Sequence, residues 1–235
     1  MVFTQTDYEK VLDQFNELSD KKYKRFNDAL TPGSISKYGI RIPEMRKIAK
    51  EIIKGDWRGF LYLAKDNSTE EIMLQGLVIA LSKCSMQEKL SYTEKHIHKI
   101  STWALCDTFV CELKDVRNNK EITDAFLDKY LNSENEFILR FIIIMRMCYF
   151  LDESSIKKTF EIINNIKHEG YYVKMAKAWA IATALAKQRN QTLEFLDNNN
   201  LDAFTLNKAV QKIRESYRIS ESDKQYVLKY RSKIN

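Results

Sequence analysis

Two tryptophans, one aspartate and one arginine stand out because they come from three separate segments that favour helices. Trp103 and Asp107 are four residues apart in "STWALCDTF", so a helix places them on one face. Arg140 is the cation at the start of the apolar run "FILRFIIIM", and Trp179 lies in the Ala-rich segment "YYVKMAKAWAIATAL". Indole faces attract cations, and a guanidinium can grip an anion with two parallel hydrogen bonds. The four side chains therefore have the composition of a site for a charged ligand.

Each of these residues also has a purely structural explanation. A helical tryptophan is usually a core residue or a packing anchor. Arg140 and Asp107 have opposite charges and would suit a buried bridge between two helices, and Asp107 alone would suit a local cap or ion pair. Residue type alone leaves these alternatives open.

Composition favours an all-α protein. Hydrophobic residues make up 44% of the 235-residue chain and charged residues 30%, which is typical of a globular protein. Only 2 Pro and 6 Gly are present, too few for the turns of a many-stranded fold. No linker interrupts the pattern, so we expect one domain over residues 1–235.

Apolar periodicity predicts helices along the whole chain. Val11, Leu12, Phe15 and Leu18 mark the first helix, and a short segment over 20–30 stops at Thr31-Pro32-Gly33. Further helices are expected at 43–53, 56–65, 69–83, 86–99, 102–114, 118–131, 134–151, 154–166, 169–187, 191–198, 202–216 and 220–233. The most apolar helices recur after roughly 31 to 36 residues, a period typical of stacked helix pairs. This rhythm favours a solenoid, with a plain helical bundle as the alternative.

The charge of the chain is compatible with a polyanionic partner. The formal net charge is +6, and basic residues gather in the helices that contain or follow Trp179. The candidate phosphate contacts are Arg140, Lys174, Lys177, Lys208, Lys212 and Arg214, with Arg218 just beyond them. A solvated helix face is the usual explanation for such lysines, and it stays open for each of them.

Several other classes of protein are disfavoured. The longest apolar run, near 137–151, contains Arg140 and Arg146 and is too short to span a bilayer. The N-terminus lacks the features of a signal peptide, so we expect a cytoplasmic protein with reduced cysteines and no contact with a membrane. No Gly-rich phosphate loop, nucleotide motif or metal-ligand spacing occurs, so no cofactor and no metal are expected.

From about residue 8 to its end, the chain resembles the HEAT-like-repeat DNA alkylation repair proteins of the AlkD type. The resemblance is carried by the three segments above, with "YGIRIPEMRKIAKEI" near the front and "TLNKAVQKIRESYRIS" near the back. It implies a right-handed superhelical solenoid and a DNA glycosylase that removes purines alkylated at N3 or N7. It also implies a catalytic site of Trp103, Asp107, Arg140 and Trp179 on the concave side. The implied partner is duplex DNA, bound by a monomer that is associated with the nucleoid when it is on DNA.

The resemblance implies a role for each site residue. Loss of an alkylated purine moves positive charge from the base to the sugar, so the main requirement is electrostatic stabilisation. Asp107 would stabilise the cationic sugar and orient water, the two indoles would hold the lesion or the deoxyribose, and Arg140 would grip a flanking phosphate.

Two departures from the family pattern affect this interpretation. Active members commonly have Trp-Asp-x-Val-Asp where this chain has Trp-Ala-Leu-Cys-Asp at 103–107. They also have a substantial second helix near the N-terminus that recognises the lesion, whereas the segment here is short and resembles a sub-branch that lacks that helix. Tyr23, Phe26 and Tyr38 are the aromatic residues that could substitute for it. The alternatives to an enzyme are a non-catalytic DNA-binding or damage-sensing protein and a helical adaptor that holds a peptide.

Overall fold

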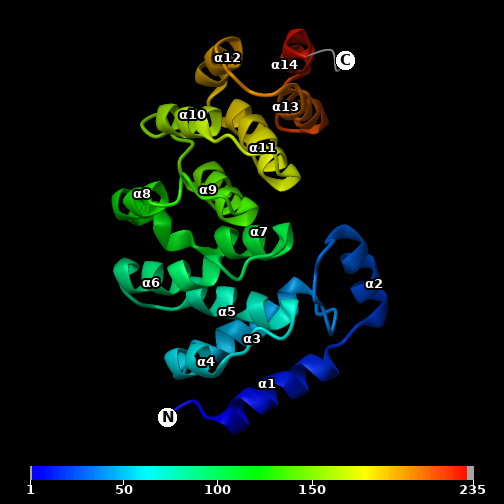
Figure 1. The fold of residues 1–235 in the computed structure, drawn as a ribbon, viewed down its shortest axis with the longest axis vertical. Helices are drawn as coiled ribbons and strands as arrows, with labels where there is room; N and C mark the ends of the chain where they lie inside the picture. The colour runs from blue at the N-terminus through cyan, green and yellow to red at the C-terminus, as the bar shows by residue number, and fades with distance from the viewer. Residues whose placement is uncertain (1, 232–235) are drawn as a thin grey trace. The chain divides into compact units, whose positions relative to one another are not determined.

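The computed structural model describes residues 2–231, and every regular element in this range is helical. Fourteen α-helices and two short 3-10 helices follow one another along these residues (Figure 1). The all-α helical-repeat class predicted from the sequence is therefore confirmed. The chain divides into two compact units between Ile122 and Thr123, inside α8. The expected single domain over 1–235 stays a prediction.

The bounds of the helices agree closely with the periodicity of the sequence. The first unit contains α1 (Gln5–Glu17), α2 (Lys21–Leu30), α3 (Ile42–Ile52), α4 (Trp57–Leu63), α5 (Thr69–Leu81), α6 (Met86–Ile97), α7 (Trp103–Glu112), η1 (Lys114–Asn118) and the start of α8 (Lys120–Asp128). The second contains α9 (Glu136–Tyr149), α10 (Ile156–Asn165), α11 (Tyr171–Lys187), α12 (Arg189–Asp197), α13 (Ala203–Glu215), α14 (Glu221–Tyr226) and η2 (Val227–Tyr230). The helix expected at 220–233 is thus split into α14 and η2, and its last two residues lie outside the described range.

The first helix begins at Gln5, ahead of Val11, because of a capping box. The Thr4 hydroxyl accepts the N–H of Asp7, and the Asp7 carboxylate accepts the N–H of Thr4. This arrangement satisfies two backbone donors at the helix start. A serine, threonine or aspartate also caps most of the other helices, as Thr102 does for α7.

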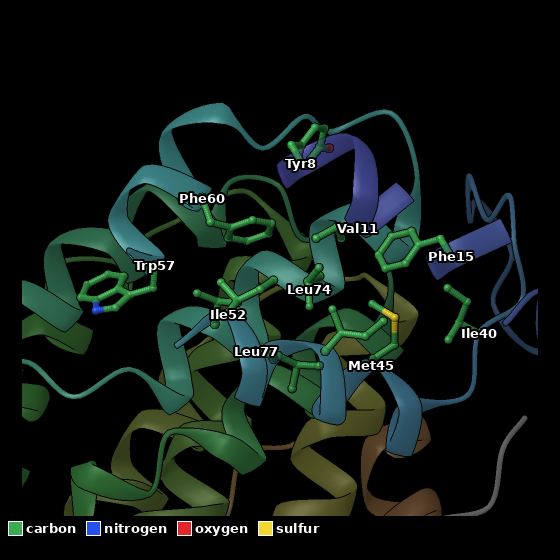
Figure 2. Packing of buried hydrophobic residues seen from close by; sticks show 13 residues of the cluster. Tyr8, Val11, Phe15, Ile40, Met45, Ile52, Trp57, Phe60, Leu74 and Leu77 are labelled. Atoms are coloured by element: carbon green, nitrogen blue, oxygen red, sulfur yellow. The ribbon is translucent and has the colours of Figure 1, made fainter. Parts of the chain in front are cut away.

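In the first unit, α5 packs between α3 and α7, and α6 covers α5. α5 is buried almost throughout, which explains its apolar sequence. Figure 2 shows the adjoining core, where Phe60, Leu74 and Leu77 lie among side chains of α1, α3 and α4. A row of central helices, each covered by an outer helix, is the arrangement expected when each helix pair buries its apolar face on its neighbours.

A buried carboxylate fixes the path between α2 and α3. Glu70 of α5 accepts hydrogen bonds from the Ser36 hydroxyl and from the N–H groups of Lys37, Tyr38 and Gly39, the last at 2.7 Å. Gly39 has φ +72°, and a Cβ there would lie 2.6 Å from the carbonyl oxygen of Asp20 at the start of α2. Glycine is therefore required at this close approach.

In the second unit, α11 packs between α9 and α13, while α10 and α12 cover them. Arg146 of α9 is buried and forms ion pairs with Asp124 and Asp128 of α8, which Lys158 of α10 also contacts. Phe160 and Phe195 stack between α10 and α12 with ring centroids 4.4 Å apart. These contacts tie α8 to α9 and join the outer helices α8, α10 and α12 to one another.

Two further sequence expectations concern membranes and cysteines. None of the helices within residues 2–231 combines the length and apolar character needed to cross a bilayer. Within the described residues, no disulfide joins Cys84, Cys106, Cys111 or Cys148.

Candidate functional site

Trp103 and Asp107 lie one turn apart on α7, in the first unit. The Thr102 hydroxyl accepts the N–H of Leu105, so α7 begins at Trp103. The three residues between Trp103 and Asp107 are buried, whereas both of these side chains are partly exposed. α7 therefore points an indole and a carboxylate away from the core along the same edge.

The indole of Trp103 has a structural partner. Its Nε1 donates a hydrogen bond to the backbone carbonyl of Leu30, with the two atoms 2.9 Å apart. Leu30 is the last residue of α2, where carbonyls lack partners within the helix. Trp103 thus holds the end of α2 beside the start of α7.

The segment that the sequence marked as short forms the ten-residue helix α2. None of its residues is buried, and Phe26 is 63% exposed. The guanidinium of Arg41 lies over the ring of Tyr23, and Tyr38 packs edge-on against Phe15 of the core. Of the three aromatic residues considered as substitutes, Phe26 is therefore the most available to a ligand.

Arg140 lies on α9 in the second unit and is only 5% exposed. Its Nη1 donates to the carbonyl of Tyr172, 3.0 Å away, in the first turn of α11. Glu136, one turn earlier on α9, accepts the N–H of the same Tyr172 at 2.5 Å. The two side chains clamp both backbone polar groups of Tyr172, so Arg140 fixes where α11 begins.

Trp179 lies in the middle of α11, and 37% of its surface is exposed. It lines an open hollow of about 600 Å³ between the last turns of α11 and α13. We call this cavity the Trp179 hollow. Its other lining residues are Ala182, Thr183, Ala186, Lys187, Lys212, Glu215, Ser216, Tyr217 and Arg218. Trp179 is therefore a surface residue and not a core anchor.

The four residues fall into two pairs that belong to different units. Trp103 and Asp107 share α7, while Arg140 and Trp179 lie on α9 and α11, which pack together. The convergence of all four on one concave surface stays a prediction.

Three of the six candidate phosphate contacts are already engaged within the protein, namely Arg140, as described above, Lys174 and Lys177. Lys174 pairs with Glu169 and Asp202, and the hydrogen bond that its ammonium donates to Glu169 raises the pKa of Lys174. Lys177 is buried and donates to the carbonyl of Ile166, and loss of solvation lowers the pKa of Lys177 to about 8. Burial keeps the ammonium of Lys177 away from the surface that a phosphate would reach.

The other three candidates lie on α13 and divide between two hollows. Lys212 lines the Trp179 hollow, whereas Lys208 and Arg214 line another open hollow of about 620 Å³ beside Phe204. These three cations are accessible to a polyanion.

The sequence did not single out Lys187 or Tyr217 as part of a site. Tyr217 is fully exposed in the turn that follows α13. The sequence signal that could have identified Tyr217 is a large aromatic residue within the polar stretch "RESYRIS".

Within residues 2–231, no three His, Cys, Asp or Glu side chains cluster as a metal site requires.

Comparison with known proteins gives one family. Residues 11–213 match the family described as DNA alkylation repair enzyme, and all four candidate residues fall within that span. A search of curated proteins gives no match.

Proposed function

Because this chain belongs to the DNA alkylation repair enzyme family, we propose that it is a DNA glycosylase that releases N3- and N7-alkylated purines from duplex DNA. The observation that carries the proposal is the family match over residues 11–213, within which Trp103, Asp107, Arg140 and Trp179 occur in the order that the resemblance requires. The exposure of Trp179 and the partial exposure of Trp103 and Asp107 support a role in binding DNA.

The proposed reaction is hydrolysis of a glycosidic bond. Alkylation at N3 or N7 leaves the purine positively charged, so the bond between C1′ and the base nitrogen already breaks readily. Its electron pair goes to the base, which leaves uncharged, and the sugar becomes an oxocarbenium ion. Water adds to C1′ and loses a proton, which gives an abasic site. Neither an oxidant nor a reductant is consumed.

Each proposed role follows from side-chain chemistry. The carboxylate of Asp107 stabilises the developing cation on the sugar, and such preorganised electrostatic stabilisation lowers the barrier. The indole faces of Trp103 and Trp179 hold the cationic lesion and its deoxyribose. Arg140 contributes to binding as well as to rate, because its proposed partner is a phosphate that is present before and after the reaction.

The direct test is release of N3-methyladenine or N7-methylguanine from alkylated duplex DNA by the purified protein. Asp107→Asn keeps the shape of the side chain and removes its charge, so folding and DNA binding should survive. Base release should fall at least about tenfold, equivalent to roughly 1.4 kcal/mol of barrier. Undiminished release by Asp107→Asn would remove the catalytic role of this carboxylate.

A non-catalytic DNA-binding protein is the second candidate, and a specific observation favours it. Trp103 donates to the carbonyl of Leu30 and Arg140 to the carbonyl of Tyr172, so two of the four residues make structural hydrogen bonds. A wild-type protein that binds duplex DNA and releases no alkylated purine would select this function.

A further inference from the structure

The Trp179 hollow offers cations that the protein itself does not neutralise. Lys187, Lys212 and Arg218 line it, and none of them forms an ion pair with another residue of the described range. The single acidic lining residue, Glu215, accepts a hydrogen bond from Gln211 at 2.8 Å. The hollow therefore carries a local excess of positive charge.

The stability of helix ends explains why some of these cations occur here, but not all of them. Lys187 and Lys212 lie in the last turns of α11 and α13, where the helix dipole favours cations. Arg218 lies beyond the end of α13, and its side chain is exposed. Its position at the hollow is not explained by the stability of either helix.

Aromatic side chains flank these cations. Trp179 is partly exposed and Tyr217 is fully exposed, so neither ring gains the free energy of complete burial within the chain. Lysine, arginine and tyrosine side chains are among those that contact the phosphates and sugars of duplex DNA. A planar guanidinium matches two oxygens of one phosphate, while lysines act as point charges.

We propose that the Trp179 hollow binds one sugar–phosphate unit of the DNA strand that flanks the damaged nucleotide, with Arg218 and Tyr217 as binding residues. The inference rests on the proposed function, because DNA is the polyanion that the protein then encounters. Arg218 holds the phosphate, Lys187 and Lys212 add charge, and Tyr217 packs against the sugar. Trp179, itself one of the proposed catalytic residues, lines the hollow.

The test measures affinity for a short undamaged duplex over a range of salt concentrations. Arg218→Gln should lower the slope of log affinity against log salt by about one, as expected when one phosphate contact is lost. Lys187→Gln should act in the same direction. Tyr217→Ala should weaken binding about fivefold or more at every salt concentration without changing the slope, because it removes apolar packing against the sugar and no charge.

Lys157→Gln is the matched control, because Lys157 is an exposed cation that lines a different hollow beside Phe160. It should leave the affinity and the slope near those of the wild type. Arg218 and Tyr217 are both exposed, so the variants should also melt at the wild-type temperature. Unchanged affinity in Arg218→Gln and Tyr217→Ala would overturn the proposal.

A free phosphate offers the same chemistry as a phosphodiester, so a second arm titrates inorganic phosphate against the bound duplex at constant ionic strength. Displacement that Arg218→Gln abolishes would support a shared phosphate position. Suppose instead that Arg218→Gln abolishes binding of inorganic phosphate and leaves the affinity for the duplex unchanged. That result would overturn the assignment of the hollow to DNA. These experiments measure duplex binding and not base release. Weaker binding by the variants would therefore support this inference even if the protein is not a glycosylase. Conversely, a glycosylase indifferent to these substitutions would refute only this inference.

Discussion

The indole nitrogen of Trp103 donates a hydrogen bond to the backbone carbonyl of Leu30, across 73 positions of sequence. Leu30 ends α2, a helix with no buried residue of its own. Few packing contacts therefore hold α2 in place. One hydrogen bond that does so comes from Trp103, a residue to which the family resemblance assigns a catalytic role. The position of α2 and the orientation of the indole thus depend on each other.

Trp103→Phe should loosen α2 while it keeps an aromatic ring at the start of α7. The substitution removes the only hydrogen-bond donor of the side chain, and such a bond contributes about 0.5–1.5 kcal/mol. Amide hydrogen exchange in α2 should therefore become faster, with smaller changes in α3 and α5. Trp179→Phe is the control, and it should leave exchange in α2 unchanged. Equal exchange rates in α2 for Trp103→Phe and the wild type would show that the bond does not hold this helix.

Arg140→Ala should lower stability as well as DNA affinity. The substitution removes the hydrogen bond that the buried guanidinium donates to the carbonyl of Tyr172, and such a bond from a charged group contributes about 1.5–3 kcal/mol. Chemical denaturation measures the free energy of unfolding, and duplex binding is measured on the same samples. Lys157→Ala, which removes an exposed cation, should leave stability within about 0.5 kcal/mol of the wild type. If Arg140→Ala unfolded at the wild-type denaturant concentration, the clamp on Tyr172 would contribute nothing.

The helices of this protein could be predicted from the sequence because their signals are local. Apolar periodicity and capping residues such as Thr102 lie within a few positions of the ends that they mark. The tie between Trp103 and Leu30 could not be predicted, because no local pattern brings two positions so distant in sequence together.

The candidate site shows the same division between local and distant information. The one-turn spacing of Trp103 and Asp107 follows from helix geometry alone. Lys177 was expected to contact phosphate because it precedes Trp179, yet a separation of two residues turns it toward a different side of α11, where it is buried. The carbonyl that accepts its hydrogen bond belongs to Ile166 at the end of α10, and the periodicity of α11 gives no information about that contact.

Charge reversal at Lys208 and Lys212 together should weaken duplex binding and flatten its salt dependence. Both residues line open hollows on α13, and each phosphate contact contributes about 0.9 to the slope of log affinity against log salt. Fluorescence anisotropy with a labelled duplex at several salt concentrations gives both quantities. The control is the double variant Lys157→Glu and Lys167→Glu, which makes the same change in net charge at exposed positions in and near α10. Equal effects of the two double variants would mean that net charge, and not a path along α13, governs binding.

His96 should make the protein less stable in mild acid. Burial lowers the pKa of His96 to about 3, below the ordinary value of 6.5, and neither ring nitrogen has a hydrogen-bond partner in the described structure. Between these values the unfolded chain binds a proton that the folded chain does not, so stability falls as pH falls below about 6.5. This single group accounts for up to about 2 kcal/mol between pH 7 and pH 5. His96→Leu should reduce the difference in unfolding free energy between these two pH values by that amount, and an unchanged difference would contradict the prediction.

Gly76→Ala should destabilise the packing that carries α7. A Cβ at Gly76 would lie 2.6 Å from Nε2 of His96 and 3.3 Å from the ring of Phe109, which itself packs edge-on against His96. Because all three residues are buried, the added methyl group should cost about 1–3 kcal/mol of unfolding free energy. Gly55→Ala is the matched control, since the nearest atom to its Cβ would be 3.9 Å away. Thermal melting should therefore separate the two variants. Phe109 belongs to the same helix as Trp103 and Asp107, so any shift that accommodates the methyl group should also lower duplex affinity or base release. A Gly76→Ala protein that matched Gly55→Ala in melting temperature would show that α5, α6 and α7 pack less tightly than these distances require.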